Sequence, residues 1–300
     1  MNSLPTEGPA GIPVQHPWAR RLLRTVQFGF ARLASPDGHV RARAVPFDLA
    51  FTGPAADCIT RHIYRLGSHE PPIARYLVDH VRVGSGDVAL DVGANLGWYS
   101  VLLDRLSEPG ARIFAFEPDP RSYQLLLGNL AANGATRVTP LNTALGERAG
   151  TAELHRYRDS NNGRHTLLAG DASGGTVRVP VSTLQEVWSA RDLGDAPIRF
   201  LKIDVEGFEY FVLRGAGALL ERCQCVLLEY SPKSLAVAGL KGEVLADLLT
   251  GAGLRARAFV NGGLREVSHS ELVRAESQLD LLLTPAGAGS RARPRKLVSS

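Results

Sequence analysis

The stretch Asp91–Ser100, DVGANLGWYS, decides the fold that we expect for this 300-residue chain. It follows an apolar run at residues 88–90 that is typical of a short buried strand, and it leads into a helical pattern at residues 98–106. Between the two lies a turn that contains two glycines. This order of elements is typical of an open α/β sheet that binds a small molecule at the carboxyl ends of its strands. Glycine suits such a turn because it tolerates unusual backbone angles and leaves room for a ligand.

The spacing of the two glycines favours one cofactor over another. Gly93 and Gly97 form the pattern G-x-x-x-G, whereas dinucleotide-binding enzymes have G-x-G-x-x-G at this position. Asp91 directly precedes the turn, where its carboxylate can bind the amino end of a methionine-like group, directly or through water. We therefore expect S-adenosylmethionine here in place of a nicotinamide dinucleotide.

The composition is that of an ordinary globular protein, with 44% hydrophobic and 21% charged residues. No apolar run approaches the roughly 20 residues that cross a bilayer, and the first residues lack the apolar centre of a signal peptide. Three cysteines, Cys58, Cys223 and Cys225, are too few for a disulfide framework in a chain of this length and lack the spacing of a zinc site. We therefore predict a reducing, cytoplasmic location.

The charges argue against two classes of partner. The chain has 34 basic and 30 acidic residues, and four of the basic residues lie in the stretch 286–300, which contains no acid. Without that stretch the protein is electrically neutral, whereas a nucleic-acid groove needs a clustered basic surface. We expect a small-molecule or glycan partner, no nucleic acid and no membrane, and the sequence leaves the oligomeric state open.

Four regions follow one another along the chain. Residues 1–17 are rich in Pro and Gly and predict a disordered leader, and residues 18–83 predict a mainly helical addition that begins with an amphipathic helix. Residues 84–285 form the expected catalytic domain, and residues 286–300 a disordered basic tail. The apolar stripe of the first helix consists of Trp18, Leu22, Leu23, Val26 and Phe30.

Apolar runs at regular intervals predict the strands of the catalytic domain. They cover residues 88–90, 112–117, 138–142, 199–204 and 225–229, with two late strands at 254–260 and 279–283. Helical patterns separate the first five, so we expect an α/β sheet that is mainly parallel and has helices on both faces. The late strands are expected to add an antiparallel edge. Pro140 predicts a bulge or a local bend in the third strand, because proline cannot donate to a neighbouring strand.

A long polar segment at residues 158–176, rich in Asn, Gly and Ser, interrupts this alternation. We expect its flanks, residues 152–157 and 177–181, to pair as strands. Loops of this length are either functional or disordered. Together with the N-terminal addition, this segment is the expected cover of an acceptor pocket.

Three of the predicted strands end in an acidic residue, namely Asp91, Glu117 and Asp204. Since parallel strands end at one edge of a sheet, we expect these carboxylates to converge. Glu117 follows Asp91 by 26 residues, and an acid at about this distance beyond a glycine turn accepts hydrogen bonds from both ribose hydroxyls of a nucleotide.

The motifs in this part of the chain resemble those of the FkbM family of S-adenosylmethionine-dependent methyltransferases. The resemblance runs in consistent order from about residue 57 to residue 231. The motifs that carry it lie at residues 91–97, 116–118, 142–146, 202–209, 212–216 and 228–230. It implies a Rossmann-like class I methyltransferase fold. It also implies methyl transfer to a hydroxyl oxygen of a sugar or a secondary metabolite, which are the acceptors for which that family is known.

The resemblance also implies which residues bind the cofactor. Those at its methionine end would be Asp91, Gly93, Ala94, Asn95 and Gly97. Glu117 would hold the ribose, while Asn142 and Ala144 would approach the adenine or the ribose. Asp204 would lie near the methionine and the reactive methyl group.

The residues suggest two sources for the base that removes the proton of the acceptor. Asp204 and Glu206 lie two apart and share a face if the strand stays extended, so that one can hold the cofactor while the other takes the proton. His165, in the polar segment, is a further candidate base because its ordinary pKa lies near neutrality. Lys202 is expected to form an internal ion pair with Asp204.

Three other interpretations remain open at this point. A divalent cation on Asp204, Glu206 and Glu229 is chemically reasonable, but we predict no metal, because Glu206 can equally cap the helix that follows. Methylation of nitrogen, on a small molecule or on RNA, is a second enzymatic interpretation. The third is an NAD-binding or catalytically silent nucleotide-binding protein.

Overall fold

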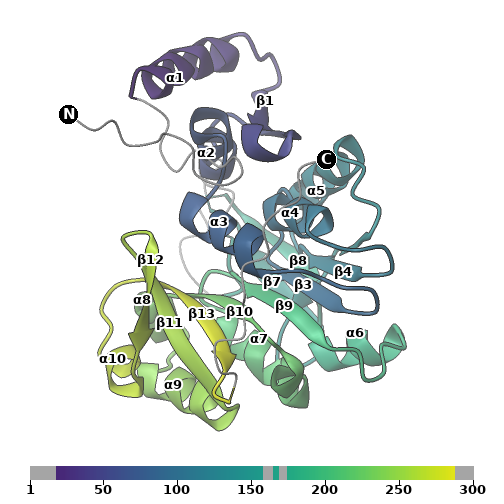
Figure 1. Ribbon diagram of the computed structural model, residues 1–300, viewed down its shortest axis with the longest axis vertical. Helices are drawn as coiled ribbons and strands as arrows, with labels where there is room; N and C mark the ends of the chain where they lie inside the picture. Colours follow the sequence, from purple (N-terminus) through teal and green to yellow (C-terminus); the bar gives the residue numbers. More distant parts are fainter. Residues whose placement is uncertain (1–17, 158–164, 169–173, 288–300) are drawn as a thin grey trace, which may run out of the picture.

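The computed structural model describes residues 18–157, 165–168 and 174–287 (Figure 1). Its centre is an eight-stranded sheet with the strand order β12-β11-β13-β10-β9-β3-β4-β5. The parallel strands are β3 (Val88–Val92), β4 (Arg112–Phe116), β5 (Val138–Leu141), β9 (Ile198–Ile203) and β10 (Val226–Tyr230). The strands β11 (Leu254–Val260), β12 (Gly263–Val267) and β13 (Leu279–Pro285) add antiparallel pairs. The prediction of a mainly parallel α/β sheet is confirmed.

The antiparallel part is larger than predicted. β13 lies between β10 and β11, and β12 forms the outer edge. The sequence analysis missed β12 because its segment, GLREV, has mixed polarity and is mostly exposed. The expected bulge at Pro140 is wrong, because its pairing with β4 continues in register from Ile113 with Val138 to Phe116 with Leu141. Pro140 is tolerated since β5 is the opposite edge of the sheet, where one missing amide donor has no strand to bond.

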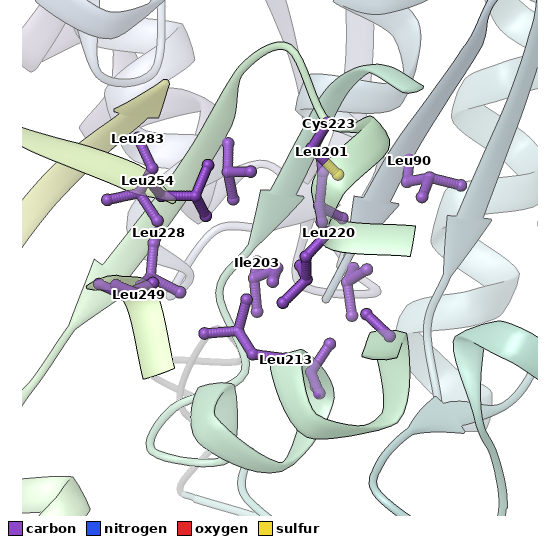
Figure 2. Packing of buried hydrophobic residues seen from close by; sticks show 14 of the residues in the cluster. Leu90, Leu201, Ile203, Leu213, Leu220, Cys223, Leu228, Leu249, Leu254 and Leu283 are labelled. Atoms are coloured by element: carbon purple, nitrogen blue, oxygen red, sulfur yellow. The ribbon is translucent and has the colours of Figure 1, made fainter. Parts of the chain in front are cut away.

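Helices cover both faces of the sheet, as predicted. One face carries α3 (Pro71–His80), α4 (Trp98–Arg105) and α5 (Pro120–Ala132). The other carries α6 (Leu184–Ala190), α7 (Glu209–Ala216), η3 (Gly217–Arg222), α8 (Pro232–Val237), α9 (Gly242–Gly251) and α10 (His269–Val273). Figure 2 shows part of this second layer, where Leu213 and Leu220 belong to the same apolar cluster as Leu201 and Ile203 of β9. The strands are apolar on both faces because both are covered.

The N-terminal addition packs against the sheet. Its elements are α1 (Trp18–Leu33), β1 (His39–Ala44), η1 (Val45–Phe47), β2 (Leu49–Pro54) and α2 (Cys58–Leu66). Phe51 and Ile63 are buried in the same apolar cluster as Ile113 of β4. The β1–β2 hairpin is also tied to α5 by side-chain amides. Asn129 bonds the amide and carbonyl of Thr52, and Asn133 bonds those of Ala50, at 2.7–3.0 Å.

The helix α1 forms as predicted, but its apolar stripe does not face the protein. Leu22, Leu23 and Phe30 are 59%, 58% and 68% exposed. Phe28 is buried instead and packs against Tyr64 of α2 with ring centroids 5.1 Å apart. No helix among the described residues is both long enough and apolar enough to cross a lipid bilayer.

The polar segment is flanked by a small second sheet with the order β6-β8-β7. Its strands are β6 (Ala144–Leu145), β7 (Gly150–His155) and β8 (Thr176–Ser182). β7 and β8 are antiparallel, which confirms the predicted pairing of the flanks. Most of the polar segment, residues 158–164 and 169–173, lies outside the described residues. The predicted leader 1–17 and residues 288–300 of the predicted tail also lie outside them.

Candidate functional site

A cleft of about 800 Å³ lies where β3, β4 and β9 end. Seven of the predicted site residues line it: Gly93, Ala94, Asn95, Glu117, Ala144, His165 and Asp204. Four others, Asp91, Gly97, Asn142 and Glu206, are not among its lining residues. The acidic strand ends Glu117 and Asp204 therefore converge as expected, whereas Asp91 does not reach the cleft.

The glycine turn after β3 is shaped by the packing of the protein itself. Gly93 and Gly97 have φ angles of +77° and +93°, in the left-handed region that favours glycine. A Cβ on Gly93 would overlap the carbonyl oxygen of Asp204, and one on Gly97 would lie 2.7 Å from Leu126 Cδ1. Both glycines are therefore required by neighbouring protein atoms, and since Gly93 also lines the cleft, the room that the turn leaves for a ligand stays a prediction.

Glu117 is held firmly at the end of β4. The amide of Asn95 donates to its Oε2 at 2.7 Å, and the amide of Asp119 donates to its Oε1 at 2.9 Å. Burial raises the pKa of Glu117 to about 7, although these two amide donors oppose the shift. Each carboxylate oxygen can accept a further hydrogen bond. A carboxylate fixed in this way at the wall of a cleft fits the two adjacent hydroxyls of a ribose.

Asn142 supports Glu117 and does not contact the cleft. Its side-chain amide donates to the carbonyl oxygens of Glu117 and Pro118 at 2.8 and 3.1 Å. It thereby fixes the end of β4, and its approach to the adenine or the ribose stays a prediction. Its neighbours Thr143 and Ala144 line the cleft instead.

Lys202 occupies the centre of a buried ion-pair network. Its Nζ donates to the carbonyl oxygen of Gly93 at 2.7 Å and lies 3.2 Å from Asp204 Oδ2 and 3.7 Å from Asp91 Oδ1. Burial alone would lower the pKa of Lys202, but the carboxylates of Asp204, Asp91 and Glu70 outweigh it and raise that pKa above its usual value. The lysine therefore stays charged, and the predicted internal ion pair is confirmed.

Asp91 lies beneath the cleft and is fully buried. Ser100 Oγ donates to its Oδ2 at 2.6 Å, and its Oδ1 faces Lys202. Burial raises the pKa of Asp91, while Lys202 and Ser100 oppose the rise. Asp91 thus positions Lys202 and the turn, and its contact with the methionine end of the cofactor stays a prediction.

Asp204 and Glu206 come together by a different route from the predicted one. β9 ends at Ile203, and Glu206 stands in a turn with a φ angle of +51°, so the assumption of an extended strand is wrong. Carboxylate oxygens of Asp204, Glu206 and Glu229 nevertheless lie within 4.8 Å of one another. This is the set of residues on which the metal interpretation rests.

Glu229 offers a way to hold these acids together without a cation. Burial raises the pKa of Glu229 to about 11, and the carboxylates of Asp204, Glu206, Glu209 and Asp280 contribute to the rise. Burial and these neighbouring carboxylates therefore favour the protonated form of Glu229. A neutral acid in this position removes one of the three repelling charges.

His165 lines the cleft and is tied to the neighbouring backbone. Its Nδ1 lies 3.2 Å from the backbone amide of Tyr157, which donates to it. Its service as the general base stays a prediction.

Two further side chains belong to this site: His69, which the sequence did not point to, and Tyr99, which was expected to pack in the core or to shield the cofactor. His69 lines the cleft, and burial lowers its pKa to about 4, so that it is neutral. Its Nδ1 lies 3.4 Å from Nδ1 of His62, whose ring stacks on it. Tyr99 also lines the cleft and donates its hydroxyl to Glu70. No periodic pattern marks these residues, because His69 and Glu70 lie in the link between α2 and α3.

The comparisons with known proteins agree with this geometry. The family described as "Methyltransferase FkbM domain" matches residues 91–249. Methyltransferase sdnD of Sordaria araneosa is 34% identical over 165 residues, which cover 46% of this chain and 63% of that protein. The 31-O-demethyl-FK506 methyltransferase FkbM of Streptomyces tacrolimicus is 32% identical over 208 residues, which cover 59% of this chain and 76% of that protein. The hexuronic acid methyltransferase AglP of Haloferax volcanii is 26% identical over 160 residues, which cover 53% and 62%.

Proposed function

Because the chain belongs to the FkbM-domain family of methyltransferases, we propose that it transfers a methyl group from S-adenosylmethionine to a hydroxyl oxygen of a sugar or secondary-metabolite acceptor. Two relatives support this class of acceptor. One is named for the 31-O position of FK506 and the other for a hexuronic acid. Both names describe those proteins, and they guide the choice of acceptors for the test below.

The observation that carries the proposal is the arrangement of Glu117. Its two oxygens are fixed by the amides of Asn95 and Asp119, and the residue lines the cleft. A carboxylate accepts hydrogen bonds but donates none. It therefore selects a ligand with paired hydroxyl donors, which a ribose supplies.

The cofactor, when bound, supplies a methyl group that is already activated on a positively charged sulfur. The protein then has two tasks, which are alignment of the acceptor and removal of its proton. Asp204 lines the cleft, and its Oδ2 is held 3.2 Å from Lys202 Nζ. We propose that Asp204 Oδ1 accepts the proton of the acceptor hydroxyl. Glu206 does not line the cleft, and we assign it to positioning Asp204.

Other side chains around the cleft would orient the acceptor. His165 and the neutral His69 contribute polar groups, the latter from the link before α3. Leu154, Leu167 and Phe208 supply an apolar wall. Such a mixture suits an acceptor that combines hydroxyls with an apolar ring or chain.

The proposal includes a cytoplasmic setting. All three cysteines are free, and two of them, Cys223 and Cys225, are buried. Thiols that remain unpaired are typical of a reducing compartment.

Binding and transfer can be tested separately. Titration calorimetry with S-adenosylhomocysteine and with NAD should give binding of the first alone. Transfer is then followed with isotopically labelled S-adenosylmethionine on hexuronic acids, neutral glycosides, hydroxylated macrolides, amines and RNA. Label on oxygen in one of the first three supports the proposal. Label on nitrogen, binding without any transfer, or binding of NAD in place of S-adenosylhomocysteine would each contradict it.

A further inference from the structure

The exposed face of α1 is the feature that the proposed reaction does not use. Leu22, Val26, Phe30 and Leu33 follow one another at intervals of four, four and three residues, which places them on one side of the helix. They are 59%, 50%, 68% and 85% exposed, and Leu23 beside them is 58% exposed. Large apolar side chains gathered in this way on a surface mark a binding face.

The opposite side of α1 is already attached to the protein. Phe28 is buried against Tyr64 of α2, and Arg65 Nε donates to Thr25 Oγ1 at 3.0 Å. Figure 1 shows α1 at one end of the molecule, beyond α2 and away from the large sheet. The apolar face therefore points outward because the packing of α1 fixes it there.

The N-terminal addition around this helix carries an excess of positive charge. α1 contains four arginines and no acidic residue. Residues 18–66 contain eight arginines and three aspartates, one of which, Asp57, is buried. Residues 67–285 contain 22 basic and 26 acidic residues. The neutral total on which the expectation of no membrane partner was based thus combines a basic N-terminal addition with an acidic catalytic part.

We propose that α1 docks on the surface of a membrane that carries anionic lipids, with its apolar face among the lipid chains and Arg24 and Arg32 near the phosphates. A helix with a leucine- and phenylalanine-rich side and an arginine-rich remainder lies in the plane of such an interface. Anionic headgroups attract each nearby arginine. A second copy of this chain fits less well, because it would bring two acid-free, arginine-bearing helices against each other.

Flotation of the full-length protein with vesicles tests the proposal. The vesicles are pure phosphatidylcholine, or two parts phosphatidylcholine to one part phosphatidylglycerol. We expect binding to the anionic vesicles alone, and weaker binding at high salt. The variant Arg24→Gln/Arg32→Gln should partition roughly thirty-fold more weakly, since each arginine near an anionic surface contributes about a factor of five. Leu23→Ser/Phe30→Ser should lose binding as well.

A matched control separates this face from exposed apolar surface in general. Val237 is 62% exposed at the end of α8, and Val237→Ser should bind vesicles like the unchanged protein. Circular dichroism and thermal melting check that each variant is folded. If the variant with the apolar substitutions does not fold, the arginine variant still tests the proposal.

Three results would overturn the proposal. The first is no binding of the unchanged protein to anionic vesicles. The second is undiminished binding of both α1 variants, which would assign the binding to another basic part of the chain. The third is a dimer in sedimentation that Phe30→Ser dissociates, without any vesicle binding, which would assign the face to a second copy.

Discussion

Replacing Glu117 by alanine removes the two acceptor oxygens that we assign to the ribose. A hydrogen bond to a charged group contributes about 1.5 kcal/mol or more. Losing two of them costs about 3 kcal/mol, which corresponds to roughly 150-fold weaker binding of S-adenosylhomocysteine. Since Glu117 is only 6% exposed, water cannot readily replace the lost oxygens.

The pH dependence of binding follows from the same carboxylate. Burial raises the pKa of Glu117 to about 7, and only the ionised form can accept from both hydroxyls. Affinity should therefore be highest above pH 7 and fall about tenfold per pH unit below it. Glu117→Ala should remove this dependence.

The same shift has the opposite effect on the stability of the free protein. The folded pKa of Glu117 is raised above its ordinary value of 4.5, so its contribution to stability is present below pH 4.5 and is lost as the pH rises through about 7. The difference is about 3 kcal/mol. Ligand affinity should consequently increase over the pH range in which the free protein loses this contribution.

Calorimetric titration with S-adenosylhomocysteine between pH 5.5 and 8.5 measures the affinity, and thermal melting of the free protein over the same range measures its stability. Glu153→Ala, a change of the same kind on the exposed side of β7, is the matched control and should bind like the unchanged protein. An affinity that is constant across this pH range, or that survives in Glu117→Ala, would refute the assignment of the ribose to Glu117.

Three further changes test other parts of the site. Asn142→Ala removes two hydrogen bonds that hold the end of β4, so calorimetry should show about tenfold weaker cofactor binding, and unchanged affinity would contradict the supporting role. Gly93→Ala forces a Cβ onto the Asp204 carbonyl at a positive φ. It should therefore lower the free energy of unfolding by more than about 3 kcal/mol, and the melting temperature with it. A melting temperature equal to that of the unchanged protein would argue against the close approach. Glu229→Gln copies the protonated acid, so activity should stay within about twofold of normal, also with EDTA present, whereas a large loss would favour a bound cation.

The sheet could be predicted because the patterns that mark its strands are properties of short stretches of sequence. The strand before Asp91 and the acid at Glu117 could be recognised because apolar runs and strand-end positions are local properties. Whether a strand-end acid faces the cleft is not local. Asp91 is turned away from it by Lys202, a residue 111 positions later in the chain, and that pairing exists only once β3 and β9 lie side by side.

The backbone around Glu206 shows a second limit. The predicted strand ends at residue 204, and Gly207 indicates a turn nearby, but the sequence does not show that Glu206 itself takes a positive φ. An extended strand would place the two carboxylates on one face of the strand. They lie close together instead because the chain folds back. In the same way, the periodicity of α1 predicted an amphipathic helix correctly, but periodicity does not say which side the protein covers.

The amides of Asn129 and Asn133 that join α5 to the β1–β2 hairpin have a consequence for synthesis on the ribosome. Asn129 lies 77 residues after its partner Thr52. At a synthesis rate of 5–20 residues per second, roughly 4 to 15 seconds pass between the synthesis of the hairpin and the synthesis of these asparagines. Throughout that interval the backbone of β2 that they later bond remains open to other chains. Molecular chaperones that shield nascent strands should therefore matter most for this protein before α5 emerges.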